Sequence, residues 1–170
     1  MKWFIKCLRQ YADFNGRARR KEYWWFEVVY AIVIVVLLVP AFFLLGDNLD
    51  EDNIYINLLR NPFGWIAIVF FLVMFVPSLA VTVRRLHDIG RSGWWVLLFL
   101  GGDIFDAIGD EITEYDPTLA IIFSLAAIAI GILSLIWMFT DSKPGSNQWG
   151  ENPKEMDAAE VEIEKKEEEL

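Results

Sequence analysis

The residues best suited to chemistry lie in one short polar stretch, residues 84–95, which has long apolar sequence on both sides. The stretch holds three arginines, the only histidine and an aspartate: Arg84, Arg85, Arg91, His87 and Asp88. Guanidinium groups form paired hydrogen bonds with phosphate and carboxylate oxygens. A histidine next to a carboxylate resembles part of a proton relay or of a metal site. Because so many charges are costly in hydrocarbon, the stretch is expected at a membrane surface.

Three interpretations of this stretch stay open. In the favoured one the arginines set the membrane orientation, Asp88 pairs with one of them to fix the loop, and Trp94 and Trp95 anchor the next helix at the interface. In the second, the arginines bind the headgroup of an anionic lipid. Catalysis is the least favoured, because the chain has no nucleotide-binding glycine loop, no metalloprotease motif and no serine elbow. We therefore do not expect an enzyme, a cofactor or a metal site.

The composition indicates a membrane protein. Of 170 residues, 55% are hydrophobic, with 8 Trp and 13 Phe, which exceeds what a soluble domain of this size contains. The net charge of -9 is unevenly distributed, since residues 1–23 are basic and residues 140–170 are acidic. This division gives no reason to expect a nucleic-acid partner. Cys7 is the only cysteine, so a disulfide within the chain is excluded.

The elements that would position the polar stretch are apolar runs long enough to cross a bilayer. They predict an all-α, polytopic transmembrane helical bundle with four spans, at about 24–45, 63–83, 94–109 and 119–139. The third is short or re-entrant, because Asp103 and Asp106 interrupt it and a helix of that length is only about 24 Å long. Residues 1–153 would form one membrane domain, and the acidic tail 154–170 is expected to be disordered or a frayed helix.

The distribution of Lys and Arg predicts the orientation of the chain. Residues 2–13 place aromatic and basic residues on opposite faces of a helix, which predicts an amphipathic helix in the headgroup layer. The basic head and residues 84–93 would face the cytoplasm, while the loops at 46–62 and 101–118 are poor in basic residues. With four crossings, the protein is multi-pass and both termini lie in the cytoplasm; if the third segment is only re-entrant, the C-terminus lies outside instead.

Two further features concern partners. Glu27 is the only charge in the first span; we expect it to pair with Arg20 or Arg84, and the alternative is a small dimeric transporter that uses this carboxylate. The last span carries a stripe of small residues, expected to pack within the chain or between copies in a homo-oligomer: Ala120, Ser124, Ala127, Gly131 and Ser134. The bilayer itself, with anionic lipids, is the other expected partner.

Three separated segments, residues 14–24, 83–95 and 144–153, together resemble the YhaH-like family of small bacterial inner-membrane proteins, a domain of unknown function. The resemblance runs from about residue 10 to residue 153. It implies a compact helical protein of the cytoplasmic membrane, with no established activity and no catalytic residue. The acidic stretch 101–118 is longer than the short turn usual in the family, and the Glu-rich tail lies outside the match.

All three segments fall on the cytoplasmic side of the four-span arrangement, so we expect them to meet in one cluster there. Glu22 or Asp88 would pair with the arginines in this cluster. Its role is either structural or the binding of a lipid headgroup. The residues expected in it are Arg17, Arg20, Glu22, Arg84, Arg85, His87, Asp88, Arg91, Asn147 and Trp149.

Overall fold

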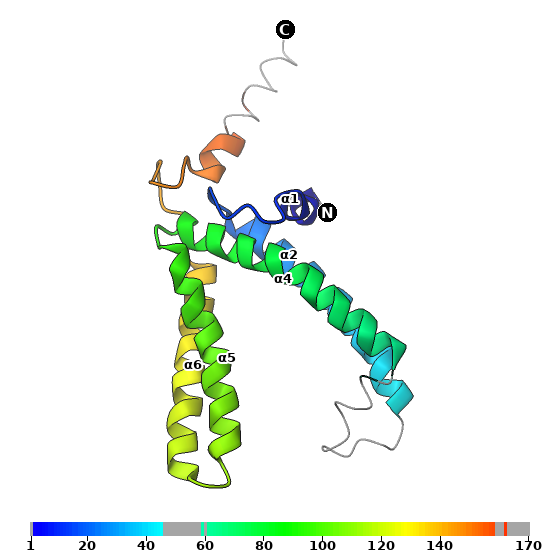
Figure 1. Ribbon diagram of the computed structural model, residues 1–170. Helices are drawn as coiled ribbons and strands as arrows, with labels where there is room; N and C mark the ends of the chain where they lie inside the picture. The colour runs from blue at the N-terminus through cyan, green and yellow to red at the C-terminus, as the bar shows by residue number, and fades with distance from the viewer. Residues whose placement is uncertain (1, 46–58, 60, 159–161, 163–170) are drawn as a thin grey trace. The chain divides into compact units, whose positions relative to one another are not determined.

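A computed structural model describes residues 2–45, 59, 61–158 and 162 of the chain (Figure 1). Within these residues the regular structure is helical, which confirms the all-α prediction. The main helices are α1 (Lys2–Arg9), α2 (Arg20–Leu45), α4 (Pro62–Asp88), η2 (Gly93–Trp95), α5 (Val96–Ile112) and α6 (Pro117–Phe139). Most of the acidic loop predicted at 46–62 and most of the predicted tail lie outside the described residues; residues 153–158 are helical.

Three of these helices are long and apolar enough to cross a membrane: Arg20–Pro40 of α2, Pro62–Asp88 of α4 and Pro117–Phe139 of α6. The third predicted span, 94–109, corresponds to α5, which has 17 residues and is therefore about 26 Å long. The structure also moves several predicted boundaries. α2 begins four residues before the predicted start at 24, α4 continues five residues past the predicted end at 83, and α5 runs from 96 to 112 instead of 94 to 109.

The chain forms two compact units, and the first comprises Met1–Asp13 and Trp24–Ala80. In it α2 and α4 pack against each other, with the rings of Tyr30 and Phe70 stacked at 5.8 Å. α1 contacts both helices. Phe4 stacks on Phe26 of α2 at 5.4 Å, and the Tyr11 hydroxyl, just after α1, donates to the Val73 carbonyl of α4.

The expected pairing of Glu27 with Arg20 or Arg84 stays a prediction, and the structure gives Glu27 a hydroxyl partner. The Ser78 hydroxyl of α4 donates to Glu27 Oε1 at 3.1 Å, while Arg84 pairs with Glu22. Ser78 follows Pro77, the proline inside α4, and a short hydroxyl on the facing helix can satisfy a carboxylate without a second charge.

The second unit comprises Phe14–Tyr23 and Val81–Leu170. Its longest part is a hairpin in which α5 and α6 lie side by side (Figure 1). α6 begins with Pro117, after Asp116 accepts hydrogen bonds from the backbone N–H groups of Thr118 and Leu119 at 3.0 and 3.1 Å. This is the usual N-cap arrangement for a helix, and it fixes the short turn at the end of the hairpin.

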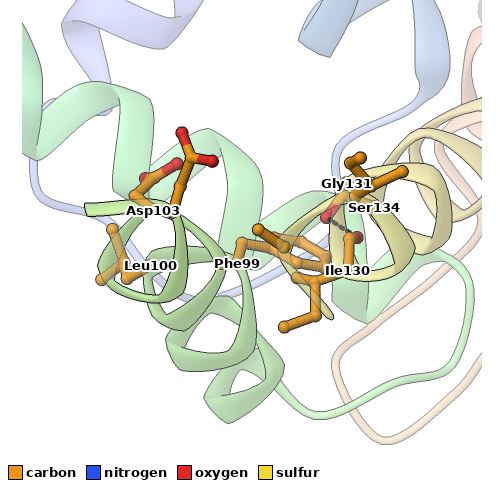
Figure 2. Close-up of a pocket in the computed structure, with 10 residues that line it drawn as sticks. Phe99, Leu100, Asp103, Ile130, Gly131 and Ser134 are labelled. Atoms are coloured by element: carbon orange, nitrogen blue, oxygen red, sulfur yellow. Dashed lines mark hydrogen bonds between the residues drawn. The ribbon is translucent and has the colours of Figure 1, made fainter. Parts of the chain in front are cut away.

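The small residues of α6 divide into two groups. A Cβ added at Gly109 of α5 would lie 3.2 Å from Ser124 Oγ and 3.3 Å from the Ala120 carbonyl oxygen, so the helices touch there. Gly131 differs, because a Cβ added to it would meet no atom within 4 Å. It borders a groove of about 400 Å³ between the two helices, also lined by Phe99, Leu100 and Ser134 (Figure 2).

Candidate functional site: a buried arginine–aspartate cluster

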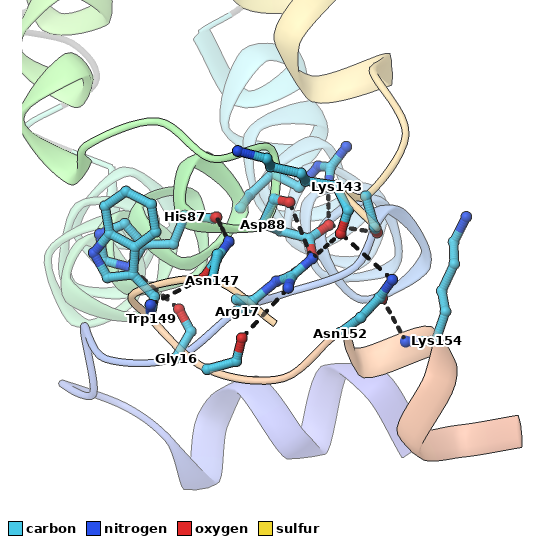
Figure 3. A network of polar contacts seen from close by, with 12 residues as sticks. Gly16, Arg17, His87, Asp88, Lys143, Asn147, Trp149, Asn152 and Lys154 are labelled. Carbon is cyan, nitrogen blue, oxygen red and sulfur yellow. Dashed lines mark hydrogen bonds and ion pairs between the residues drawn. The ribbon is translucent and has the colours of Figure 1, made fainter. Parts of the chain in front are cut away.

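The end of α4 is where the three sequence segments meet (Figure 3). Gly90 has a φ of 79° and stops the helix, since its N–H bonds to the His87 carbonyl and the Arg91 N–H to the Leu86 carbonyl. Two other segments then bond to the backbone of α4. The Ala18 N–H donates to the Arg84 carbonyl at 3.0 Å, and the Lys143 N–H donates to the Asp88 carbonyl at 2.9 Å.

The Asp88 carboxylate is the centre of this arrangement, and its side chain is fully buried. It accepts hydrogen bonds from Arg17 Nε at 3.1 Å, Arg85 Nη1 at 2.5 Å and Ser142 Oγ at 2.6 Å. These donors come from three separate parts of the chain. We call Arg17, Arg85, Asp88 and Ser142 the clasp.

The two clasp arginines satisfy carbonyl groups as well as the carboxylate. Arg17 donates to the carbonyls of Lys143 at 2.6 Å and Gly145 at 2.7 Å. Arg85 donates to the carbonyls of Met138 at 3.4 Å and of Thr140. The last carbonyls of a helix lack partners within it, so Arg85 both pairs with Asp88 and closes the C-terminal end of α6.

His87 also contacts the other two segments that meet here. Its Nδ1 lies 3.1 Å from the Gly16 carbonyl oxygen; because that oxygen can only accept, Nδ1 carries the proton. The ring stacks on Trp149 with centroids 4.5 Å apart and planes 8° apart. The Asn147 amide donates to the His87 backbone carbonyl at 2.9 Å, and Asn147 also pairs with Gly150 through the backbone.

The remaining predicted residues lie around the clasp. Arg84 Nη1 is 3.6 Å from Glu22 Oε1, and both side chains are buried. Arg20 donates to the Phe139 carbonyl at 3.0 Å and lies 3.6 Å from Asp141, which also accepts from Lys154. That hydrogen bond from Lys154 is the main cause that lowers the pKa of Asp141. Arg91 stands apart from this network.

The structure therefore brings together most residues expected in the cluster and gives Asp88 and Glu22 the predicted pairing with arginines. Sequence reasoning missed Ser142 and Lys143. Ser142 is an ordinary serine after an apolar run, and Lys143 contributes its backbone groups, which no side-chain pattern reveals. Among the described residues, no group of three or more His, Cys, Asp and Glu has an arrangement that would hold a metal ion.

The charged groups of the cluster are largely paired within the protein. Three buried guanidinium groups face two buried carboxylates, and Arg17 and Arg85 also donate to backbone carbonyls. Buried charges with complete hydrogen bonding are tolerated, whereas removal of one partner is costly.

Comparison with known proteins gives relatives over nearly the whole chain. Residues 11–151 match the family model described as "Protein of unknown function (DUF805)". The chain is 30% identical to the inner membrane protein YhaI of Escherichia coli K12 over 158 residues, which cover 91% of this chain and 97% of YhaI. It is 35% identical to the inner membrane protein YhaH of the same organism over 108 residues, 59% of this chain and 74% of YhaH.

A shorter match of 83 residues, 49% of this chain, is 32% identical to the vacuolar histidine transporter YPQ3 of Saccharomyces cerevisiae and covers 28% of that protein. No solved structure matches the chain. The extent of the family match, together with the apolar helices, leads to one conclusion: the chain belongs to the DUF805 family, to which YhaH-like inner membrane proteins are related, and it is an integral membrane protein.

Proposed function

We propose that this protein is a four-span protein of the bacterial inner membrane with both termini in the cytoplasm, and that its role is structural or in interactions with partners. The clasp holds its cytoplasmic ends in one rigid arrangement. The single observation that carries the proposal is that Asp88 accepts hydrogen bonds from Arg17, Arg85 and Ser142.

The segments that the clasp joins support four crossings. Asp88 lies before the α5–α6 hairpin and Ser142 after it, so the chain leaves and returns to one side of the membrane. If α6 crosses, α5 must cross too. η2 and α5 together are about 31 Å long, enough for a hydrocarbon core of about 30 Å. The same argument applies to Arg17 and Asp88, which lie before α2 and at the end of α4.

Charge supports the cytoplasm as the side on which the clasp lies. Arginines and lysines gather around it, and the positive-inside rule places such segments in the cytoplasm. The opposite end of the hairpin, residues 110–116, carries acidic residues and no basic one.

We further propose that α1 lies in the headgroup layer. Lys2 Nζ and Lys6 Nζ lie 5.1 and 5.6 Å from the Trp3 ring, while Ile5 is exposed. Phe4 is on the face that contacts α2. A helix that pairs with a span on one side and presents basic and apolar groups on others suits this layer.

The buried arginines are poor candidates for binding lipid headgroups. Arg17, Arg84 and Arg85 are at most 7% exposed, and Arg17 and Arg85 already donate to Asp88 and to backbone carbonyls. A phosphate would have to displace these partners. Headgroup binding is therefore proposed below for cations that the clasp leaves exposed.

Transport by a dimer is the second candidate, and Glu27 is the observation that favours it. This carboxylate lies in α2 and accepts a hydrogen bond from the hydroxyl of Ser78. The partial similarity to a vacuolar histidine transporter points in the same direction.

Two experiments test these proposals. An alkaline phosphatase fused after residue 158 should be inactive in cells, because this enzyme needs the periplasm, and a green fluorescent protein fused there should fluoresce. Strong phosphatase activity would contradict the four-span arrangement. For the second candidate, the flux of solute into proteoliposomes is compared between two variants. A flux that falls in Glu27→Gln but not in Ser142→Ala would favour transport over a structural role.

A further inference from the structure

Two cations beside the clasp remain exposed and without an acidic partner. Arg91 lies just after the turn that ends α4, and Lys143 follows Ser142 of the clasp. Within the described part of the chain, no carboxylate forms an ion pair with either side chain. Arg20 and Lys154, by contrast, each form an ion pair with Asp141.

The structure places both cations beside the turn that ends α4. The Arg91 guanidinium lies over the ring of Trp137, 3.9 Å from its centroid, which fixes its plane. The Lys143 side chain lies over Gly90, the residue that precedes Arg91. A Cβ at Gly90 would be 3.0 Å from Lys143 Cδ and 3.5 Å from Lys143 Nζ, so the Lys143 side chain occupies space that a side chain at Gly90 would need.

Tryptophans mark the depth of this pair in the membrane. Trp94 is 78% exposed, and Trp95 is exposed and meets Trp137 edge-to-face with centroids 5.3 Å apart. Exposed indoles at the start of a spanning helix favour the boundary between headgroups and hydrocarbon. The two cations at the same end of the hairpin would then lie at the depth of lipid phosphates.

We propose that Arg91 and Lys143 form a binding site for the phosphate of an anionic phospholipid, with Trp94 and Trp95 against its glycerol and upper acyl chains. A guanidinium whose plane is fixed binds phosphate through two parallel N–H groups, and an ammonium binds it as a point charge. The absence of a paired carboxylate leaves nothing to bind the amine of a zwitterionic headgroup, so phosphatidylglycerol is favoured over phosphatidylethanolamine. The inference rests on the proposed topology, which puts this site in the cytoplasmic leaflet.

The test is native mass spectrometry of the full chain released from nanodiscs of phosphatidylglycerol and phosphatidylcholine. The variant is Arg91→Gln with Lys143→Gln, and the matched control is Arg9→Gln with Lys21→Gln, which removes the same two charges from exposed positions elsewhere. Hydrogen bonds to charged groups contribute enough that phosphatidylglycerol retained by the site variant should fall about tenfold or more. The control should retain it as the wild type does. Equal retention in the site variant, or an equal fall in the control, would overturn the proposal.

Three further measurements keep the result interpretable. Loss of the Arg91–Trp137 contact in the double variant could disturb folding. Lys143→Gln alone leaves this contact and the backbone hydrogen bonds of Lys143 in place, so any fall in phosphatidylglycerol retention must come from the lost ammonium. We expect such a fall. Arg91→Lys with Lys143→Arg should restore most of the retention. Inorganic phosphate, added to protein in phosphatidylcholine nanodiscs, should not protect Trp94 from fluorescence quenching as phosphatidylglycerol does; equal protection would assign the site to soluble phosphate and overturn the lipid proposal.

The inference can fail separately from the topology. If the fusion after residue 158 reports the periplasm while phosphatidylglycerol retention still depends on Arg91 and Lys143, the topology is wrong and the site stands. If the fusion reports the cytoplasm and retention does not depend on them, only the lipid site is wrong.

Discussion

Around Asp88 the chain is held together by buried charges, whereas between α5 and α6 it is held together by close contact of small residues. Both regions belong to the same compact unit. In the clasp the buried side chains depend on specific partners, several of them from distant segments. In the hairpin the backbones approach because Gly102 and Gly109 have no side chains.

The difference follows from the surroundings of each region, hydrocarbon for the hairpin and the membrane surface for the clasp. In hydrocarbon there is no hydrophobic force between helices, so packing of small residues supplies the association. At the membrane surface, charged groups can be buried only if they satisfy one another. Substitutions in the two regions should therefore affect stability in different ways. Loss of one charge in the clasp leaves other charges without partners, while a substitution in the hairpin acts through side-chain volume alone.

The largest effect is expected for Asp88→Asn. This change keeps the shape of the side chain but leaves the guanidinium groups of Arg17 and Arg85 without a buried counter-charge, which should cost about 3–5 kcal/mol of the free energy of unfolding. Chemical unfolding in detergent micelles measures it. Asp141→Asn is the control, because that carboxylate is exposed and should contribute no more than about 1 kcal/mol. Similar losses in both variants would show that burial of the charge does not matter.

The hairpin gives a matched pair of substitutions. Gly109→Leu would force a side chain against Ser124 and the backbone of Ala120, at a cost of about 1–3 kcal/mol. Gly131→Leu enters open space and should stay within about 0.5 kcal/mol of the wild type. The same unfolding assay compares them. If Gly131→Leu is the more destabilising, or if it only abolishes self-association, the open side of α6 is an interface between copies.

A smaller effect is expected from the aromatic contact at the edge of the clasp. Trp149→Leu removes the stack on His87 and should lower the free energy of unfolding by about 0.5–1.5 kcal/mol beyond the lost apolar area. Trp94→Leu, at an exposed indole that stacks on no ring described here, is the comparison. An equal change in the free energy of unfolding in both variants would mean that the stack of Trp149 on His87 does not contribute to stability.

The smallest effect is a pH dependence at Asp141. Its pKa is lowered from 3.8, first by the hydrogen bond from Lys154. A lowered pKa in the folded state stabilises the protein above the ordinary pKa, and this stabilisation is lost as the pH falls through the lowered value. The stability advantage of wild type over Asp141→Asn should therefore be constant above about pH 5 and shrink below about pH 4. The effect should be small, because solvent screens this exposed pair. If the stability advantage of the wild type is the same at pH 6 and pH 3, the Asp141–Lys154 pair does not contribute to stability.

The sequence was sufficient for the parts of the fold that depend on composition. Long apolar runs predicted the helices, and the arginines together with Asp88 predicted where the segments would meet. It was insufficient where tertiary contacts decide. α4 extends to Asp88 because its terminal charges find partners inside the protein, and Glu27 pairs with Ser78 because the two helices face each other there. The division of the small residues of α6 into packed and open positions likewise depends on the line that α5 follows.

The measurement that tests the account most directly is labelling of single cysteines by a membrane-impermeant maleimide, in a Cys7→Ser background. Cysteines at the exposed positions Asn15, Ser92 and Ser146 should all be labelled in inside-out membrane vesicles and protected in intact cells. A cysteine at Tyr115, in the turn of the hairpin, should show the opposite pattern. Labelling of any one of the first three from outside, while the others react from inside, would contradict a clasp that joins these segments on one side of the membrane.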